Sequence, residues 1–422
     1  MIDQLLAMPQ EVSRRILISW LTLIDVAFLD AAYCSQEVRS QFNSLAYGEI
    51  SVYKTDVLPC DHGNINFLRW VVSRNVSLSS VALPKELEDL HDVRDLFFRQ
   101  CGDKLNILHL NLSPNKLPLR ASPCVPNIIA DIGAYCSSLN ELILVSVEQI
   151  SANVLNWCLK NKTLLKHLSI MQSSISGSVG EVIAQCCPQL TYLNLYNTAL
   201  GKTCLASIAT SCTGLIHLDI SYRHVQQDGL RAVVEHCKSL EHLNLEEAAV
   251  SDEDVIAVAE GLPQLTSLNV AFHERLTDAA IMAVAQYCKC LKQLNIVYCG
   301  QITDASIVAL CTQRPTLTVL NMSYNAKLTD QSLHSIAEHA TQLERLRFRG
   351  NRLFTQAAVE QVGRHCRQLQ HVRFTLTSAV RKSAARAFGP LASVEFDEDG
   401  DEEYEEDYEE HQAGSFTGDS RV

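Results

Sequence analysis

A six-residue pattern, Leu-x-x-Leu-x-Leu, recurs through most of the chain at a spacing of 25 or 26 residues. Clear copies begin at Leu105, Leu139, Leu165, Leu190, Leu215, Leu240, Leu265, Leu291, Leu317, Leu343 and Leu369, and weaker copies begin at Leu78 and Leu391. Side chains alternate along a strand, so the second and third leucines of each copy point to one face. A fixed period of this length indicates a solenoid of 13 repeats, each burying its apolar face against its neighbours.

The segment before each copy has the spacing of an amphipathic helix. In one repeat Ile281, Val284, Ala285 and Cys288 stand at i, i+3, i+4 and i+7, and other repeats have the same pattern. Helix starts are marked by capping pairs such as Thr303-Asp304, in which the hydroxyl accepts from first-turn amides and the carboxylate favours the helix dipole. The expected fold is therefore an α/β solenoid of strand–helix units.

The cysteines follow the same period. Six of them, Cys136, Cys187, Cys212, Cys237, Cys288 and Cys366, each precede a first leucine by three residues. Cysteines at one repeat position form a line, whereas a metal site needs ligands that converge, so we expect core packing and no bound metal. The run Cys288–Asp304, CKCLKQLNIVYCGQITD, resembles the cysteine-containing subclass of leucine-rich repeats, a resemblance that covers residues 101–396 and implies a ribonuclease-inhibitor-like solenoid, or horseshoe.

Residues 5–46 have a different, helical pattern that links Val12, Ile16, Leu17 and Leu21. The run Met8-Pro9-Gln10-Glu11-Val12, the Ile16-Leu17 pair and Asp25-Val26 resemble the F-box family, whose later tryptophan this chain lacks. The resemblance implies docking on an Skp1-like protein and a cullin. The residues that the family pattern assigns to Skp1 binding are Pro9, Ile16, Leu17, Leu21 and Val26. The alternative is a helical cap that shields the first repeat.

These patterns divide the chain into four segments. We expect an F-box-like helical segment at 1–50, a connecting region with a first irregular repeat at 51–100, the solenoid at 101–396 and an acidic disordered tail at 397–422. The chain has a net charge of −13, and 12 acidic residues lie within 395–410, which leaves the repeats close to neutral. A neutral body argues against a nucleic-acid-binding protein.

The predicted concave face carries the second, fourth and sixth residues after each first leucine. The side chains expected to contact a partner there are Tyr192, Asn194, Tyr196, His217, Asp219, His242, Asn244, Asn269, Asn295, Asn321, Arg345, Arg347, Arg349, His371 and Arg373. Aromatic rings and amides are typical of protein-recognition surfaces. The alternative is that the asparagines hydrogen bond to one another across strands and bind nothing.

The last full repeats are basic, with ten basic and two acidic residues in 343–386. Arg345, Arg347 and Arg349 share one strand face, where like charges repel unless an anion is bound. An acidic or phosphorylated substrate segment would fit this surface. The acidic tail is a second candidate, since a short tether would raise its effective concentration, and a solvated tail without this contact is the alternative.

We expect no enzyme and no cofactor, because the sequence lacks the Walker, HExxH, GxSxG and kinase patterns and its 14 histidines are scattered. The N-terminus lacks a basic region before an apolar one, and the longest apolar stretch contains two aspartates. We therefore expect no membrane segment and a location in the cytoplasm or the nucleus. The sequence leaves two functions open: substrate-recognition adaptor of an Skp1–cullin–F-box ubiquitin ligase, or a leucine-rich-repeat interaction scaffold with no link to ubiquitin.

Overall fold

The computed structural model describes residues 72, 78, 80–83, 91–111, 125–147, 150–173, 175–176, 178–198, 201, 203–222, 225, 227–375, 387–388 and 393–396. The predicted F-box-like segment at 1–50 and acidic tail at 397–422 lie outside these residues. The chain divides into two compact units. The first contains 1–273 and 286–291, and the second contains 274–285 and 292–422.

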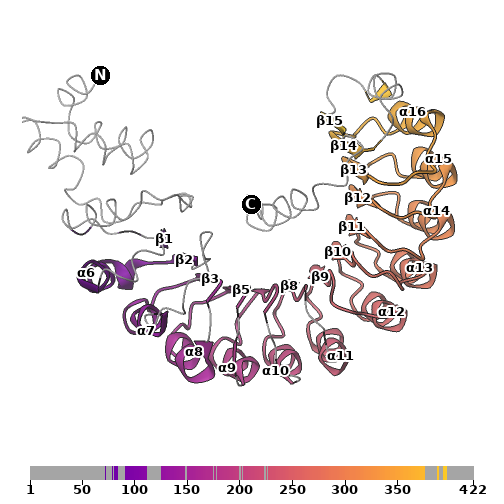
Figure 1. Cartoon of the computed structure of the whole chain (residues 1–422). Coiled ribbons are helices and arrows are strands. Elements are labelled where there is room, and N and C mark those ends of the chain that lie inside the picture. The colour runs from indigo at the N-terminus through magenta and orange to yellow at the C-terminus, as the bar shows by residue number, and fades with distance from the viewer. Residues whose placement is uncertain are drawn as a thin grey trace, which may run out of the picture. The chain divides into compact units, whose positions relative to one another are not determined.

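In the first unit, eight strands lie side by side in chain order and pair in parallel. They are β1 (Ser80–Leu83), β2 (Ile107–Asn111), β3 (Glu141–Val145), β5 (His167–Met171), β7 (Tyr192–Asn194), β8 (His217–Asp219), β9 (His242–Asn244) and β10 (Ser267–Asn269). The helices all lie on one side of the strands (Figure 1). They are α6 (His91–Cys101), α7 (Val125–Tyr135), α8 (Ala152–Leu159), α9 (Val179–Cys186), α10 (Cys204–Ser211), α11 (Gln227–His236) and α12 (Asp252–Gly261). A short helix η2 (Gly102–Lys104) follows α6, and β4 (Ile150–Ser151) pairs with β6 (Ile175–Ser176).

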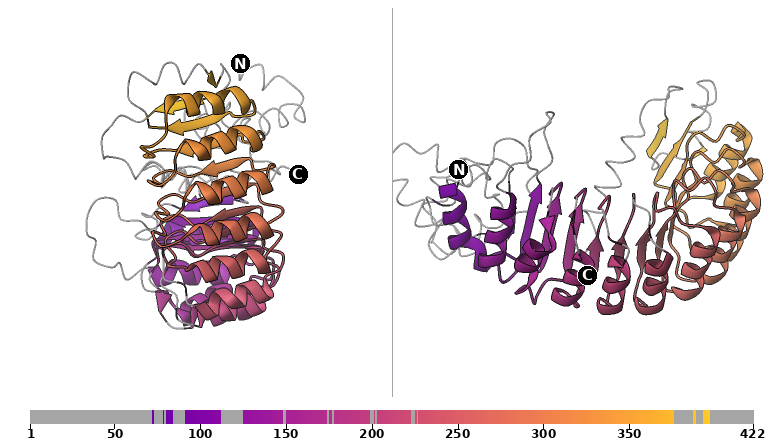
Figure 2. Two further views of the ribbon diagram at one scale, coloured as in Figure 1. Left: turned by 90° about the vertical axis from the view of Figure 1, so that its right-hand side faces the viewer. Right: turned by 60° about the horizontal axis from the view of Figure 1, so that its bottom comes forward.

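The second unit repeats this arrangement with five parallel strands. They are β11 (Gln293–Asn295), β12 (Val319–Asn321), β13 (Arg345–Phe348), β14 (His371–Phe374) and β15 (Ser393–Phe396). Its helices, coloured orange to yellow, stack beside one another in Figure 2. They are α13 (Asp278–Tyr287), which ends outside this unit, α14 (Asp304–Gln313), α15 (Asp330–His339) and α16 (Gln356–His365). Apart from the short pair β4 and β6, the eight strands of the first unit and the five of the second confirm the 13 predicted repeats, since β1 and β15 fall within the weak copies that begin at Leu78 and Leu391.

The repeated leucines form the core, as their spacing predicts. Leu190, Leu193 and Leu195 of one repeat are at most 1 % exposed, and equivalent leucines in the other repeats are buried as well. Neighbouring repeats are in register, with Leu193 opposite Leu218 and Leu218 opposite Leu243. Each such leucine contributes roughly 1.5–3 kcal/mol by burial, which makes this column of side chains the main stabilising feature of the fold.

The position three residues before the first leucine is buried in most repeats, and in several its side chain donates to the helix of the preceding repeat. The thiol of Cys212 lies 3.4 Å from the carbonyl oxygen of Cys187. Where cysteine is missing, Lys162 Nζ donates to the Ile132 carbonyl over 3.0 Å and Arg314 Nε donates over 2.6 Å to a carbonyl of α13. The predicted burial of the cysteines is confirmed, and the hydrogen bonds add a second role, because the last carbonyls of a helix have no partner within it.

The turns after β11, β12 and β13 share a buried ladder of hydrogen bonds. Asn325 Nδ2 donates to the carbonyls of Ile296 and Met322 over 2.8 and 3.1 Å, and its Oδ1 accepts from the backbone of Cys299 over 2.8 Å. Asn351 continues the ladder by accepting from the backbone of Asn325 over 2.7 Å. This position therefore satisfies buried backbone groups of the turn.

A Thr–Asp ladder joins the helix starts of the second unit. The predicted caps are present, since the hydroxyls of Thr303 and Thr329 accept from first-turn amides. The aspartate that follows each threonine also bonds to the next repeat: Asp304 accepts from the backbone of Thr329 over 2.9 Å and from its hydroxyl over 2.6 Å. Equivalent pairs are Asp278 with Thr303 and Asp330 with Thr355. Each carboxylate therefore acts on its own helix dipole and on the neighbouring repeat.

The seventh residue after the first leucine adopts a left-handed backbone conformation in nine successive repeats, with φ between 48° and 65°. These residues are Ser146, Gln172, Asn197, Tyr222, Glu247, Phe272, Tyr298, Tyr324 and Gly350. A side chain in this region costs roughly 1–2 kcal/mol, which glycine avoids. The regular turn between strand and helix therefore fixes a conformation that most of these residue types do not favour.

Candidate functional site: the strand face

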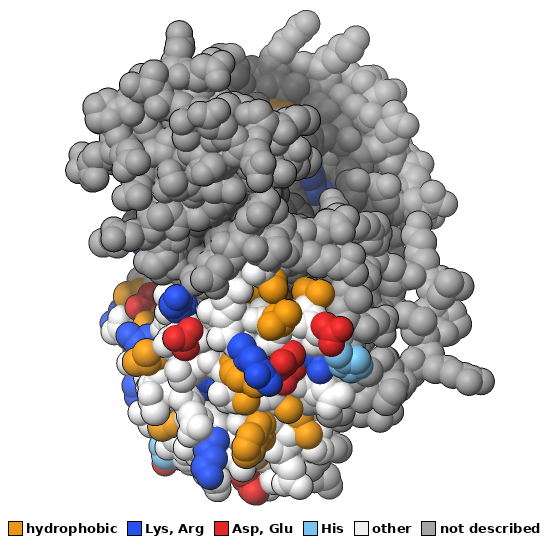
Figure 3. All heavy atoms as spheres, turned by 90° about the vertical axis from the view of Figure 1, so that its left-hand side faces the viewer, with side chains coloured by type: hydrophobic (Ala, Val, Ile, Leu, Met, Phe, Trp, Pro, Cys, Tyr) orange, Lys and Arg blue, Asp and Glu red, His pale blue; other side chains and the backbone are white. Residues whose placement is uncertain are grey.

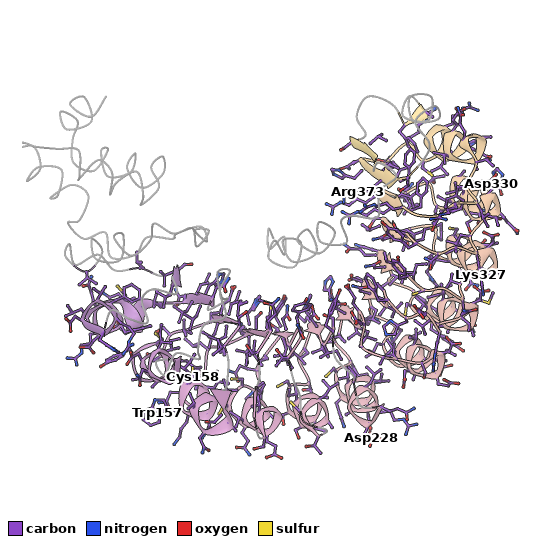
Figure 4. The ribbon with its side chains drawn as sticks, viewed as in Figure 1. Trp157, Cys158, Asp228, Lys327, Asp330 and Arg373 are labelled. Carbon is purple, nitrogen blue, oxygen red and sulfur yellow. The ribbon has the colours of Figure 1, made fainter. Side chains whose placement is uncertain are left out.

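We call the side of the strands turned away from the helices the strand face. It carries the second, fourth and sixth residues after each first leucine. In Figure 4, Arg373 of β14 projects from this face, whereas Trp157 of α8 projects from the helix side. The end of the first unit that carries α6 shows described Lys and Arg, Asp and Glu, and hydrophobic side chains intermixed in Figure 3. On the strand face, in contrast, side chains of one type lie together, aromatic in the first unit and basic in the second, so this face is the candidate site.

Four aromatic side chains on the strand face of the first unit form a stack that we call the ring ladder. Its members are His167, Tyr192, His217 and His242, one from each of β5, β7, β8 and β9. The ring centroids of His167 and Tyr192 are 3.6 Å apart, those of Tyr192 and His217 are 4.1 Å apart, and those of His217 and His242 are 5.7 Å apart. They stack because strand register places them directly opposite one another.

Burial keeps the ring ladder uncharged at neutral pH. It lowers the pKa of His217 to about 3, with smaller contributions from His242 and His167. The pKa values of His167 and His242 are also lowered, mainly by burial. Burial raises the pKa of Tyr192 to about 12. The ring ladder is therefore a neutral surface of aromatic rings across four strands.

Glu141 ends the ring ladder on the side of β3. Its Oε1 lies 3.1 Å from His109 Nε2 and its Oε2 lies 4.0 Å from His167 Nδ1. Burial raises the pKa of Glu141, but the hydrogen bond with His109 and the electrostatic interactions with His167 and His109 outweigh it, so that the net pKa is lowered. Glu141 is therefore ionised and orients both imidazole rings.

In many repeats the fourth residue after the first leucine makes hydrogen bonds inside the fold. In six strands the side-chain oxygen accepts from the backbone amide two residues later, over 2.8 to 3.3 Å. The six residues are Asn194, Asp219, Asn244, Asn269, Asn295 and Asn321. Three of them, Asn194, Asp219 and Asn321, are at most 5 % exposed. These oxygens therefore bond to the backbone within their own repeats, and among the described hydrogen bonds only Asn244 donates to another of the six, Asp219, across strands.

Two buried carboxylates accompany these amides. Asn244 Nδ2 donates to Asp219 over 3.0 Å, and Asn269 Nδ2 donates to Glu246 over 2.8 Å. The hydroxyl of Tyr222 donates to Glu246 over 2.8 Å. Burial raises the pKa of both Asp219 and Glu246. This polar network locks the side chains of β8, β9 and β10 in place beside the ring ladder, and the ring of Tyr196 meets that of Tyr222 edge-on at 5.1 Å.

The basic side chains that the sequence predicted on the strand face of the second unit lie on β13 and β14 or directly after β13. We call Arg345, Arg347, Arg349, His371 and Arg373 the arginine surface. Strand register places Arg345 opposite His371 and Arg347 opposite Arg373. Arg345 and His371 are exposed, Arg347 and Arg373 are half-buried, and Arg349 is 6 % exposed. The three arginines of one strand therefore lie on one face as predicted, at graded depth.

Tyr298 and Tyr324, each the seventh residue after a first leucine, lie next to the strand face and were not identified from the sequence. Their rings stack with centroids 5.0 Å apart, and the guanidinium carbon of Arg349 lies 5.9 Å from the centre of the Tyr324 ring. Both tyrosines occupy the left-handed seventh position, and Tyr222 and Phe272 occupy it in the first unit. Aromatic residues seven after the first leucine are visible in the sequence, so the repeat phase could have revealed this row.

Other expectations from the sequence concern different parts of the chain. The residues assigned to Skp1 binding, Pro9, Ile16, Leu17, Leu21 and Val26, lie outside the described residues. In the described part of the chain, no three His, Cys, Asp or Glu side chains converge in a way that would hold a metal ion. Among the described helices, none has the length and apolar character needed to span a bilayer.

Comparison with known proteins gives matches to one repeat family. A model described as Leucine Rich repeat matches residues 236–259, 287–311 and 313–337. In the crystal structure of the Rad7 and Elc1 complex in yeast, a similar chain is 12 % identical; the match covers 78 % of this chain and 87 % of that chain, with a TM-score of 0.47. In the TLR13–ssRNA13 complex the identity is 16 %, the coverage is 71 % of this chain and 46 % of that chain, and the TM-score is 0.46.

This chain therefore spans less than half the length of the TLR13 chain. No protein with a curated description matches it. The parallel strands, the helices on one side, the buried leucines at a fixed period and the three matches of the family model lead to one conclusion. The chain has the fold of a leucine-rich-repeat protein.

Proposed function

We propose that this protein is the substrate-recognition adaptor of an Skp1–cullin–F-box ubiquitin ligase and that it holds a target protein on the strand face. The observation that carries the binding role is the ring ladder, a neutral row of His167, Tyr192, His217 and His242 across four strands. Aromatic side chains in a rigid arrangement offer large contact areas at low entropic cost, as partner-binding surfaces do.

The link to ubiquitin rests on the sequence of residues 8–26. The run Met8 to Val12, the Ile16-Leu17 pair and Leu21 resemble an F-box, and an F-box supplies a docking helix for an Skp1-like protein. In this proposal the chain is not an enzyme. It raises the rate of ubiquitin transfer by holding the target near the catalytic subunits, which is an effect of proximity. The complex would work in the cytoplasm or the nucleus.

The second candidate is an interaction scaffold with no link to ubiquitin. The same strand face supports it, because a partner-binding surface does not depend on what the first 50 residues bind. In that case residues 1–50 are a cap for the first repeat, and the apolar side chains of Pro9, Leu17 and Val26 face the solenoid and not a partner.

Binding to a purified Skp1 protein separates these two functions. The full-length chain is compared with a Pro9→Ala/Leu17→Ala variant and with a control variant, Ser13→Ala/Gln36→Ala, which changes polar residues of the same segment. The adaptor function predicts that the wild type and the control bind Skp1 and that the Pro9/Leu17 variant does not. The thermal melt of the repeats should be the same for all three. Failure of the folded wild type to bind would refute the adaptor function and leave the scaffold.

The strand face is tested by a second pair of variants. Tyr192→Ser interrupts the ring ladder, and Trp157→Ser removes a ring that is 60 % exposed on the helix side. We expect proteins retained from a cell extract by the wild type to be retained by Trp157→Ser and lost with Tyr192→Ser. Equal retention by both variants would show that the ring ladder is not the binding surface.

A further inference from the structure

We infer that the arginine surface binds an anionic segment of the partner, either one that carries a phosphorylated side chain or one rich in Asp and Glu. The inference rests on the proposed binding role of the strand face and adds the chemical class of the ligand. It depends only on the second unit, in which Arg345, Arg347, Arg349, His371 and Arg373 come from two paired strands and the residue that follows one of them.

Strand geometry brings the charges together. Adjacent strands lie about 4.8 Å apart, and residues two apart on one strand lie about 6.7 Å apart. Arg347 and Arg373 are opposite each other, and Arg345 lies two residues before Arg347 on the same face of β13. Three guanidinium groups within this area can share the oxygens of one phosphate or of two carboxylates through charge-assisted hydrogen bonds.

The graded burial gives the surface depth. Arg345 and His371 are exposed at one edge, Arg347 and Arg373 are half-buried, and Arg349 is almost completely buried against the ring of Tyr324. The backbone amide of Arg349 donates to the hydroxyl of Ser323 over 3.0 Å, which fixes the chain at the buried end. The strands fix the backbone of these residues, and partial burial restricts the side chains of Arg347, Arg373 and Arg349, which lowers the entropic cost of binding an anion.

The neighbouring strands limit the surface on both sides. On β12 the positions in register with Arg345 and Arg347 are Val319 and Asn321, which carry no charge. On β15 the position in register with Arg373 is Glu395. A short positive surface with these neighbours suits a few anionic side chains of a peptide. A nucleic acid requires a longer row of cations, and the net charge of −13 would oppose its approach.

The test measures peptide binding to the full-length chain by fluorescence anisotropy. Three probes are used: a degenerate peptide pool with a fixed central phosphoserine, the same pool with serine, and a synthetic peptide with the acidic sequence of residues 397–410. We expect at least one anionic probe to bind about tenfold or more tightly than the serine pool. The probe that binds identifies the source of the anion, and binding of the third probe would also support contact with the acidic tail.

Matched variants separate the arginine surface from general electrostatic attraction. Arg345→Gln/Arg373→Gln removes two charges from the surface, and Arg364→Gln/Arg367→Gln removes two exposed charges from the end of α16 and the residues after it. The first variant should lose about tenfold in affinity for the anionic probe, and the second should stay within about twofold. If Arg345→Gln/Arg373→Gln does not fold, Arg345→Gln/His371→Gln changes only exposed residues.

Three results would overturn the inference. The first is that neither anionic probe binds more tightly than the serine pool. The second is that both double variants lose affinity to the same extent. The third is that single-stranded RNA of similar length binds more tightly than either anionic peptide. None of these results depends on Skp1, so they are distinguishable from a failure of the adaptor proposal.

Discussion

Asp304 should be among the most sensitive polar residues of the second unit, because one carboxylate serves two repeats. Its Oδ1 accepts from the backbone amides of Thr329 and Ser332 over 2.9 and 3.2 Å and also from the Ser332 hydroxyl, and its Oδ2 accepts from the hydroxyl of Thr329 over 2.6 Å. In Asp304→Ala the two hydroxyls can rotate toward other acceptors, but the two part-buried amides lose their partner.

The expected loss follows from these two amides. An unsatisfied buried donor costs about 1–3 kcal/mol, and the lower part of that range applies because the amides are only part-buried. The carboxylate also stabilises the N-terminus of α14 by about 0.5 kcal/mol. Asp304→Ala should therefore lower the free energy of unfolding by about 2–4 kcal/mol. The free energy of unfolding of Asp304→Asn should lie between those of Asp304→Ala and the wild type, because the amide oxygen can accept a hydrogen bond but the NH₂ group cannot.

The assay is urea unfolding followed by circular dichroism, with Asp228→Ala as the matched control. Asp228 lies in the first turn of α11, is exposed, and makes no hydrogen bond to the next repeat among the described residues, so its removal should cost about 0.3–1 kcal/mol. A difference of less than about 0.5 kcal/mol between Asp304→Ala and Asp228→Ala would show that the bonds to the next repeat do not stabilise the stack, and the reasoning would be wrong.

Three further outcomes are expected. Gly350→Ala should destabilise the fold by about 1–3 kcal/mol in urea unfolding, because φ is +65° and the new Cβ would clash with the Tyr324 ring. Gly214→Ala should be neutral, because its Cβ would make only an ordinary contact, at 3.9 Å from the carbonyl oxygen of Leu190. Asn325→Ala should cost about 3–5 kcal/mol by the same assay, and Asn325→Cys should cost less, since cysteine occupies the equivalent turn position one repeat earlier. The free energy of unfolding should fall as the pH drops below about 6.5, because His217 takes up a proton in the unfolded chain but, with a pKa of about 3, stays unprotonated in the folded one. His217→Phe should remove up to about 2 kcal/mol of this loss at about pH 5. Identical pH profiles for the wild type and His217→Phe would exclude His217 as the cause.

The repeat phase alone predicted the larger part of the fold. The leucines at Leu190, Leu193 and Leu195, the weak copies at Leu78 and Leu391, and the helix caps at Thr303 and Thr329 all lie where the spacing placed them. This was possible because each repeat buries the same positions against an equivalent neighbour, so one repeat determines the next.

The sequence was less informative about side chains that bond across repeats. Asp304 was assigned to its own helix, and its bonds to Thr329 depend on how closely two helix starts approach. The asparagines four residues after the first leucine were candidates for partner binding, but their side-chain oxygens accept from the backbone amides two residues later, just beyond the end of each strand. The stacking of His217 on Tyr192 depends on strand register and on side-chain rotamers. The repeat length predicts the register but not the rotamers.

The buried cysteines offer a way to follow the opening of single repeats. Burial raises the pKa of Cys136 and Cys212 to about 12 and that of Cys366 to about 11, so almost none of these thiols is ionised at neutral pH. Only the thiolate reacts readily with alkylating reagents or oxidants. Modification at one of these positions therefore requires that its own repeat opens first. The rates at which successive cysteines react with iodoacetamide would rank the local stability of the repeats from one end of the chain to the other.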